Sequence, residues 1–83
     1  MREELQRLAQ AYLDNAATLR DLREWLGEHT PELFSFPRVD PQASRLAIII
    51  LDDIDLMGDG AFDEQEFRSN LQQLLNEHAR TAA

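Results

Sequence analysis

The chain has 83 residues, which is enough for one small domain and too few for two. It contains no cysteine, which excludes disulfide bonds and thiolate metal sites. Its net charge of −8 gives a surface that repels nucleic-acid phosphates and anionic lipids. We therefore expect no binding to nucleic acid or membrane. The acidity leaves three explanations open, namely a basic protein partner, a metal cation or solubility alone.

The beginning of the sequence carries no secretory pattern. Met1 leads directly into a charged amphipathic segment, which lacks the basic start and apolar middle of a signal peptide. The longest apolar run, residues 46–51, is too short to span a bilayer. These features favour a cytoplasmic location, and the sequence leaves open whether the protein is a monomer or a homodimer.

The first third of the chain predicts two helices joined by a turn. Residues 2–13 place apolar side chains at helical spacing, which is typical of an amphipathic helix. The segment DNAAT then interrupts the pattern, and Asn15 suits a left-handed turn position. Thr18 and Asp21 have the spacing of a capping box, so they predict the start of a second helix.

The middle of the chain holds all three prolines. Because Pro31 disfavours helical geometry at the residue before it, we expect the second helix to end near His29. Residues 30–41 then form a proline-containing linker with apolar side chains. Asp40 followed by Pro41 predicts the cap and first residue of a third helix.

The last part of the chain predicts two further helices. The run AIIIL is rich in β-branched residues, but the helical apolar period extends beyond it in both directions, so we predict a helix. Gly58 and Gly60 should end this third helix. The fourth helix is expected from Asp63 to about His78, followed by a frayed tail over residues 79–83.

The sequence also contains a weak internal repeat. Residues 14–26 align without gaps to residues 59–71, and both segments contain a cap residue followed three positions later by an acid. Either the chain arose by duplication, or two capped helices resemble one another over this length. We predict a single all-α domain over residues 1–83, with four helices arranged as two helix–loop–helix units in the manner of an EF-hand pair.

Residues 55–66 resemble an EF-hand calcium loop. Such a loop places oxygen ligands at positions 1, 3, 5, 7, 9 and 12, with glycine at position 6. If Glu66 takes position 12, Gly60 falls at position 6 and Met57 supplies a thioether at position 3, where an oxygen is expected. The remaining candidate calcium ligands are Asp55, Asp59, the backbone carbonyl of Ala61, and Asp63.

A metal-free turn explains nearly the same residues. Asp63 can cap the fourth helix with Glu66 as its capping-box partner, and Phe62 and Phe67 occupy the positions of a hydrophobic staple. Gly60 is needed if that turn residue adopts positive φ. The sequence therefore leaves two alternatives, a capped turn and a weak calcium site with a dissociation constant of about 10⁻⁴ M or poorer.

A second resemblance covers roughly residues 5–75. The segment LREWLGEH, a proline-containing linker, an apolar helix and a later acidic segment ending in paired leucines are similar to small bacterial helical proteins of unassigned function. This resemblance implies an all-helical fold and no known activity.

The sequence does not predict an enzyme. It has no cysteine nucleophile, and its serines have no recognisable nucleophile motif. His29 and His78 lie near expected helix ends, where the helix dipole favours a cation. We therefore expect no catalytic residues and no cofactor, with Ca²⁺ as the alternative.

Three aromatic residues are the candidates for partner binding. Trp25, Phe34 and Phe36 either complete the core or line an apolar groove for another protein. We predict a non-enzymatic interaction or regulatory module with an unidentified protein partner, and the acidic surface favours a basic one. The alternative function is that of a weak EF-hand-like calcium-binding protein.

Overall fold

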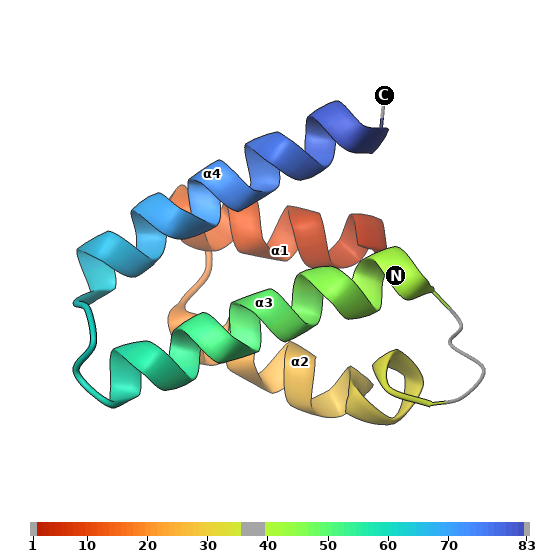
Figure 1. The fold of residues 1–83 in the computed structure, drawn as a ribbon, viewed down its shortest axis with the longest axis horizontal. Helices are drawn as coiled ribbons and strands as arrows, with labels where there is room; N and C mark the ends of the chain where they lie inside the picture. Colours follow the sequence, from red (N-terminus) through yellow and green to blue (C-terminus); the bar gives the residue numbers. More distant parts are fainter. Residues whose placement is uncertain (1, 36–39, 83) are drawn as a thin grey trace.

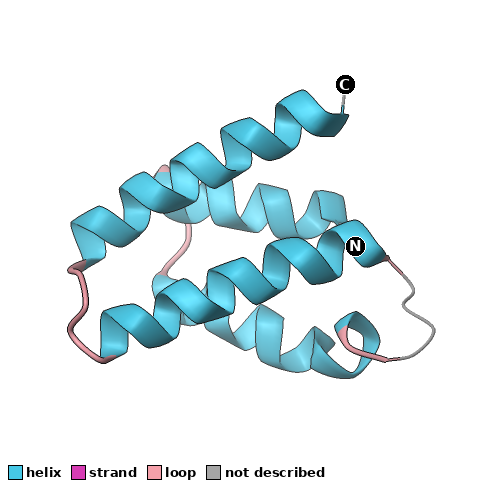
Figure 2. Ribbon diagram, in the orientation of Figure 1, coloured by secondary structure: helices cyan, strands magenta, loops and turns pink. Residues whose placement is uncertain are grey.

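The described part of the chain forms four α-helices, whose arrangement is drawn in Figures 1 and 2. The computed structural model describes residues 2–35 and 40–82, with side chains as far as residue 79. These residues contain no strand, which confirms the all-α prediction. The helices are α1 (Arg2–Leu13), α2 (Leu19–Leu33), α3 (Pro41–Gly58) and α4 (Glu64–Ala82).

The central helices are α1 and α3. Each of them packs against all three other helices, whereas α2 and α4 do not meet within the described residues. In Figure 1, α4 lies above this central pair and α2 below it. The same set of helix contacts results if α1 is exchanged with α3 and α2 with α4. The arrangement as an EF-hand-like pair of units stays a prediction.

The core forms where the apolar faces of the four helices meet. The Cα radius of gyration is 12.3 Å, close to the ~12 Å expected for a compact domain of this length. Burial of these apolar side chains supplies the main favourable free energy of folding. The buried hydrophobic residues are Leu5, Ala9, Tyr12, Leu22, Leu26, Leu33, Ala43, Leu46, Ala47, Ile50, Ile54, Phe67, Leu71 and Leu75.

The predicted starts of α2 and α3 are confirmed. Thr18 and Asp21 form a complete capping box, in which each side chain accepts a hydrogen bond from the backbone N–H of the other residue, at 3.1 and 3.0 Å. Asp40 accepts from the Ala43 N–H at 3.1 Å, and Pro41 follows it as the first residue of α3. These bonds satisfy backbone donors that have no partner inside the helix.

The turns after α1 and α3 have the same hydrogen-bond geometry. After α1, the N–H groups of Asn15 and Ala16 donate to the carbonyls of Tyr12 and Ala11, at 3.1 and 2.7 Å. After α3, the N–H groups of the two residues at the aligned positions donate to the carbonyls of Met57 and Leu56, at 3.1 and 2.9 Å. This is the Schellman motif of helix C-termini.

The left-handed residue of each turn is the one that the sequence predicted. Asn15 has φ of 64° and Gly60 has φ of 84°. In both halves, the next helix begins after a cap residue three positions later, Thr18 in one and Asp63 in the other. The two segments that align in sequence therefore share one turn geometry. An origin by duplication stays a prediction.

The predicted end of α2 near His29 is wrong, because the helix continues through Pro31 to Leu33. Proline inside a helix costs about 3 kcal/mol, whereas complete burial of a leucine contributes about 1.5–3 kcal/mol. Leu33 is fully buried, and the Phe34 N–H closes the last turn on the Thr30 carbonyl at 3.0 Å. The carbonyl opposite Pro31 belongs to Gly27, an exposed residue. The linker is therefore shorter than predicted.

The predicted end of α4 near His78 is also wrong, since the helix extends to Ala82. The last segment, EHARTA, contains alanine, glutamate and arginine, which have high helix propensity. No proline or glycine interrupts it. Residues 79–82 therefore continue the helix, where a frayed tail was expected.

Candidate functional site

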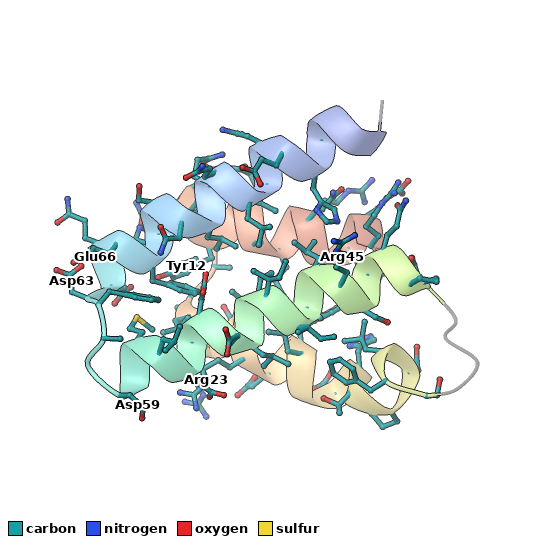
Figure 3. The ribbon with its side chains drawn as sticks, viewed as in Figure 1. Tyr12, Arg23, Arg45, Asp59, Asp63 and Glu66 are labelled. Carbon is teal, nitrogen blue, oxygen red and sulfur yellow. The ribbon has the colours of Figure 1, made fainter. Side chains whose placement is uncertain are left out.

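The candidate calcium ligands lie on three different elements. Asp55 is an exposed residue within α3, because that helix continues to Gly58. Asp59 lies at the beginning of the turn, and its side chain points away from Asp63 and Glu66 at the start of α4 (Figure 3). Ala61 lies between them in the turn. In residues 2–35 and 40–82, no three His, Cys, Asp or Glu side chains gather in a way that would hold a metal ion.

The backbone of this turn is held by its own hydrogen bonds. The Asp55 carbonyl accepts from the Asp59 N–H at 3.0 Å, and the Asp63 side chain accepts from the Glu66 N–H at 2.8 Å. The return bond of a capping box, from the Asp63 N–H to the Glu66 carboxylate, is not formed between these two described residues. Met57 is half-buried against the core. These contacts support the interpretation as a capped turn.

Replacing Asp63 with alanine is expected to lower the free energy of unfolding by about 0.5–2 kcal/mol, because it removes the N-cap of α4. Urea denaturation of the metal-free protein measures this change. Glu66→Ala is the matched control and should cost less, because its carboxylate makes no capping bond. Equal stability of wild type and Asp63→Ala would contradict the capping role.

Calcium up to millimolar concentration is expected to cause no localised change in the amide NMR spectrum. For ligation, the last turn of α3 would have to unwind before Asp55 reached the carboxylates of Asp63 and Glu66. The measurement is a calcium titration of metal-stripped protein, with magnesium as control. A saturable shift centred on Gly60 that disappears in Asp55→Ala would establish the calcium site instead.

The structure separates two of the three aromatic candidates. Trp25 and Phe34 are nine residues apart along α2 and its C-cap, or two and a half turns, which places them on opposite sides of the helix. Trp25 is half-buried against the core. Phe34 is 36% exposed. Phe36 lies outside the described residues. Phe34 is therefore the more exposed of the two described aromatic residues.

His29 has a structural role beside Trp25. Its ring stacks on the Trp25 indole with centroids 4.0 Å apart, and its Nδ1 lies 2.8 Å from the Trp25 carbonyl oxygen. The sequence predicted that His29 lies near the end of its helix. Because α2 continues to Leu33, His29 instead lies before the last turn. The stacking and the hydrogen bond account for this histidine without a catalytic role.

An apolar surface on α3 extends from Phe34. We call it the α3 surface and define it by four large apolar side chains, each at least 36% exposed: Phe34, Ile48, Ile49 and Leu56. Phe34, Ile48 and Ile49 line one shallow groove together with Leu51, Asp52 and Asp55. The α3 members of this set were not among the residues predicted from the sequence. The signal was available, because three consecutive isoleucines at 100° per residue cannot all face the core.

Acidic side chains accompany the α3 surface. Asp52 and Asp55 are exposed and line the same groove as Ile48. Burial raises the pKa of the neighbouring Asp53 carboxyl above its ordinary value, and the charge of Asp52 raises it further. The surface therefore combines apolar area with concentrated negative charge.

Within the described part of the chain, none of the helices combines the length and apolar character needed to cross a membrane. No protein-family model matches the chain, and neither a curated protein sequence nor a solved structure shows significant similarity to it.

Proposed function

We propose that this protein is a non-enzymatic interaction module that binds a protein partner on the α3 surface. The observation that carries the proposal is the apolar groove formed by Phe34, Ile48, Ile49 and Leu51, with Asp52 and Asp55 at its edge. Contiguous exposed apolar side chains with polar neighbours mark interaction sites in small soluble domains. A domain with a modest core gains stability from each apolar side chain that it buries, so exposure of four large ones calls for an explanation.

The charge of the surface favours a partner with basic side chains. Asp52 and Asp55 would meet arginine or lysine at the edge of the interface, where such pairs increase the association rate and select the partner. A second copy of this chain is disfavoured, because two molecules of net charge −8 repel one another.

Site-specific photo-crosslinking in the native host tests the proposal. A photoreactive amino acid replaces Ile48 or Leu56 on the α3 surface, or Asn70, an exposed residue of α4, as control. We expect one discrete protein to crosslink from both α3 positions and not from position 70. The absence of any product specific to α3 would refute the proposal.

The identified partner is then purified, its affinity is measured by calorimetric titration, and its association rate is measured by stopped-flow mixing. Ile48→Ser should weaken binding about tenfold or more, as expected for an apolar contact at the centre of an interface. Asp52→Asn should lower the association rate, while Glu28→Gln, which removes one charge from an exposed position of α2, should not. Unchanged affinity of Ile48→Ser would show that the partner binds elsewhere.

A further inference from the structure

A tyrosine connects the two halves of the molecule at one end of the fold. Tyr12 of α1 donates a hydrogen bond from its hydroxyl to Glu64 Oε2 at 2.9 Å. The guanidinium of Arg68 lies over the Tyr12 ring, with its central carbon 4.7 Å from the ring centroid. Arg68 also donates to the Leu13 carbonyl and to Asn15 Oδ1, at 2.6 and 3.2 Å. An aromatic ring, an arginine and a helix C-terminus thus form one filled site.

The internal alignment assigns a counterpart to each member of this site. It pairs every residue with the one 45 positions away, so Arg68 corresponds to Arg23, Tyr12 to Met57, and Glu64 to Leu19. The helix contacts agree with this pairing, because the exchange of α1 with α3 and α2 with α4 leaves them unchanged. The shared Schellman turns agree as well.

These counterparts line an open pocket. Leu19, Arg23 and Met57 surround a concavity of about 640 Å³ at the C-terminal end of α3, together with Ile54, Asp55, Gly58 and Asp59. Its volume lies within the range of ~300–1,000 Å³ that is usual for ligand pockets. The filled site has a tyrosine ring under its arginine, whereas this pocket has the flexible side chain of Met57. In the described part of the chain, Arg23 forms neither a hydrogen bond nor an ion pair.

We infer that the pocket beside Arg23 receives an aromatic side chain from the protein partner, whose ring lies against Arg23 as Tyr12 lies against Arg68. This inference rests on the proposed function and names the chemistry of the partner. The pocket adjoins the α3 surface, since Asp55 lines both concavities. One partner segment can therefore contact both.

The surroundings of the pocket specify the residues next to the aromatic ring. Asp55 and Asp59 line the pocket and carry exposed carboxylates. They complement arginine or lysine beside the aromatic residue, and they offer acceptors for a tyrosine hydroxyl. Leu19 and Met57 provide apolar and thioether contacts for the ring itself. The partner segment is accordingly an aromatic residue, preferably tyrosine, flanked by basic residues.

Two short peptides test the inference without knowledge of the partner. The probe is N-acetyl-Arg-Tyr-Arg-amide, and the control has leucine in place of tyrosine. The methyl group of Met57 provides an NMR signal within the pocket, and the chain has only two methionines. We expect a saturable ring-current shift of this signal, and an affinity about threefold or more higher for the tyrosine probe than for the leucine probe. No saturable shift at tens of millimolar probe, or equal affinity for both probes, would refute the inference.

Protein variants assign the binding to the pocket. Arg23→Ala should weaken binding of the tyrosine probe about threefold or more. Arg20→Ala, a control three residues earlier in the same helix, should have a smaller effect on this affinity. Met57→Tyr should fill the pocket from within and retain the folded spectrum. Because this variant lacks the methionine methyl signal, the backbone amide signals of Gly58 and Asp59 report binding, and they should show no preference for the tyrosine probe. Continued preferential binding to Met57→Tyr would place the ring elsewhere and contradict the inference.

The purified partner separates this inference from the proposed function. If Ile48→Ser weakens the partner while Arg23→Ala and Met57→Tyr do not, the α3 surface is the binding site and the aromatic pocket is not part of it. If the partner binds independently of Ile48, the proposed function fails whatever the peptide probes show.

Discussion

Phe67→Ala is expected to lower the free energy of unfolding by about 3–5 kcal/mol, because it leaves a cavity in the core. Phe67 is fully buried and packs against the Tyr12 ring, with centroids 5.9 Å apart and planes inclined at 54°. A domain of this size has about 4–12 kcal/mol of stability in total. The substitution should therefore remove a large share of it and lower the thermal midpoint by more than about 10 °C. Thermal and urea denaturation, followed by far-ultraviolet circular dichroism, measure both quantities.

Phe62→Ala provides the matched control. It removes the same ring from a half-buried position in the preceding turn, where less apolar area leaves contact with the core. Its cost should be less than half that of Phe67→Ala, since the free energy of burial is roughly proportional to the apolar area removed from water. Equal costs for the two variants would mean that Phe67 is not the central packing residue of α4.

The helix starts were predictable because capping is local chemistry. Thr18 and Asp21 accept from each other's backbone N–H groups, and Asp40 accepts from the N–H of Ala43 three positions later. The left-handed turn position of Asn15 follows in the same way from its neighbouring residues. Capping residues and left-handed turn residues can be recognised within a short stretch of sequence, and the structure confirms these predictions.

The end of α2 could not be predicted from residues only a few positions apart in the sequence. Pro31 is an unfavourable local signal, but Leu33 two residues later is buried, and its carbonyl accepts a hydrogen bond from the Ser44 hydroxyl of α3. Ser44 is itself fully buried. These tertiary contacts stabilise the additional helical turn, and they connect residues that the local pattern around Pro31 does not include.

The incorrect end of the second helix also affected the prediction of the candidate site. A second helix that ends near His29, as the sequence predicts, leaves the direction of Phe34 relative to Trp25 undetermined. Once the helix continues, their separation of two and a half turns places them on opposite sides. Helical geometry implies that the three consecutive isoleucines of α3 cannot all face the core, but which of them stays exposed depends on where α2 and α4 pack against α3.

Arg68→Ala is expected to cost about 2–4 kcal/mol of unfolding free energy. The side chain donates to the Leu13 carbonyl at the C-terminus of α1, which has no partner within its helix, and to Asn15 in the left-handed turn. Hydrogen bonds from a charged donor contribute about 1.5–3 kcal/mol, and the contact of its guanidinium with the Tyr12 ring adds about 0.5–1 kcal/mol. Arg68→Lys should recover only part of the loss, because an ammonium group lacks the planar guanidinium that lies over the Tyr12 ring while one of its nitrogens donates to both acceptors.

The titration of Tyr12 distinguishes loss of this contact from general destabilisation. Burial raises the pKa of Tyr12 above its ordinary value of 10.0, the hydrogen bond with Glu64 raises it further, and Arg68 opposes both. The neutral phenol is therefore favoured in the folded state, and its contribution to stability is complete below pH 10.0 and is lost as the pH rises through the folded pKa.

Because Tyr12 is the only tyrosine of the chain, phenolate absorbance reports its pKa alone. Removal of Arg68 takes away a positive charge that favours the phenolate, so the folded pKa should be higher in Arg68→Ala than in wild type. Glu64→Gln should change the same pKa in the opposite direction. If Arg68→Ala is destabilised but the pKa of Tyr12 stays at the wild-type value, the guanidinium contributes through its bonds to Leu13 and Asn15 and not through the aromatic ring. That result would also remove the template for an aromatic residue beside Arg23, because the filled site would then owe its stability to the helix cap alone.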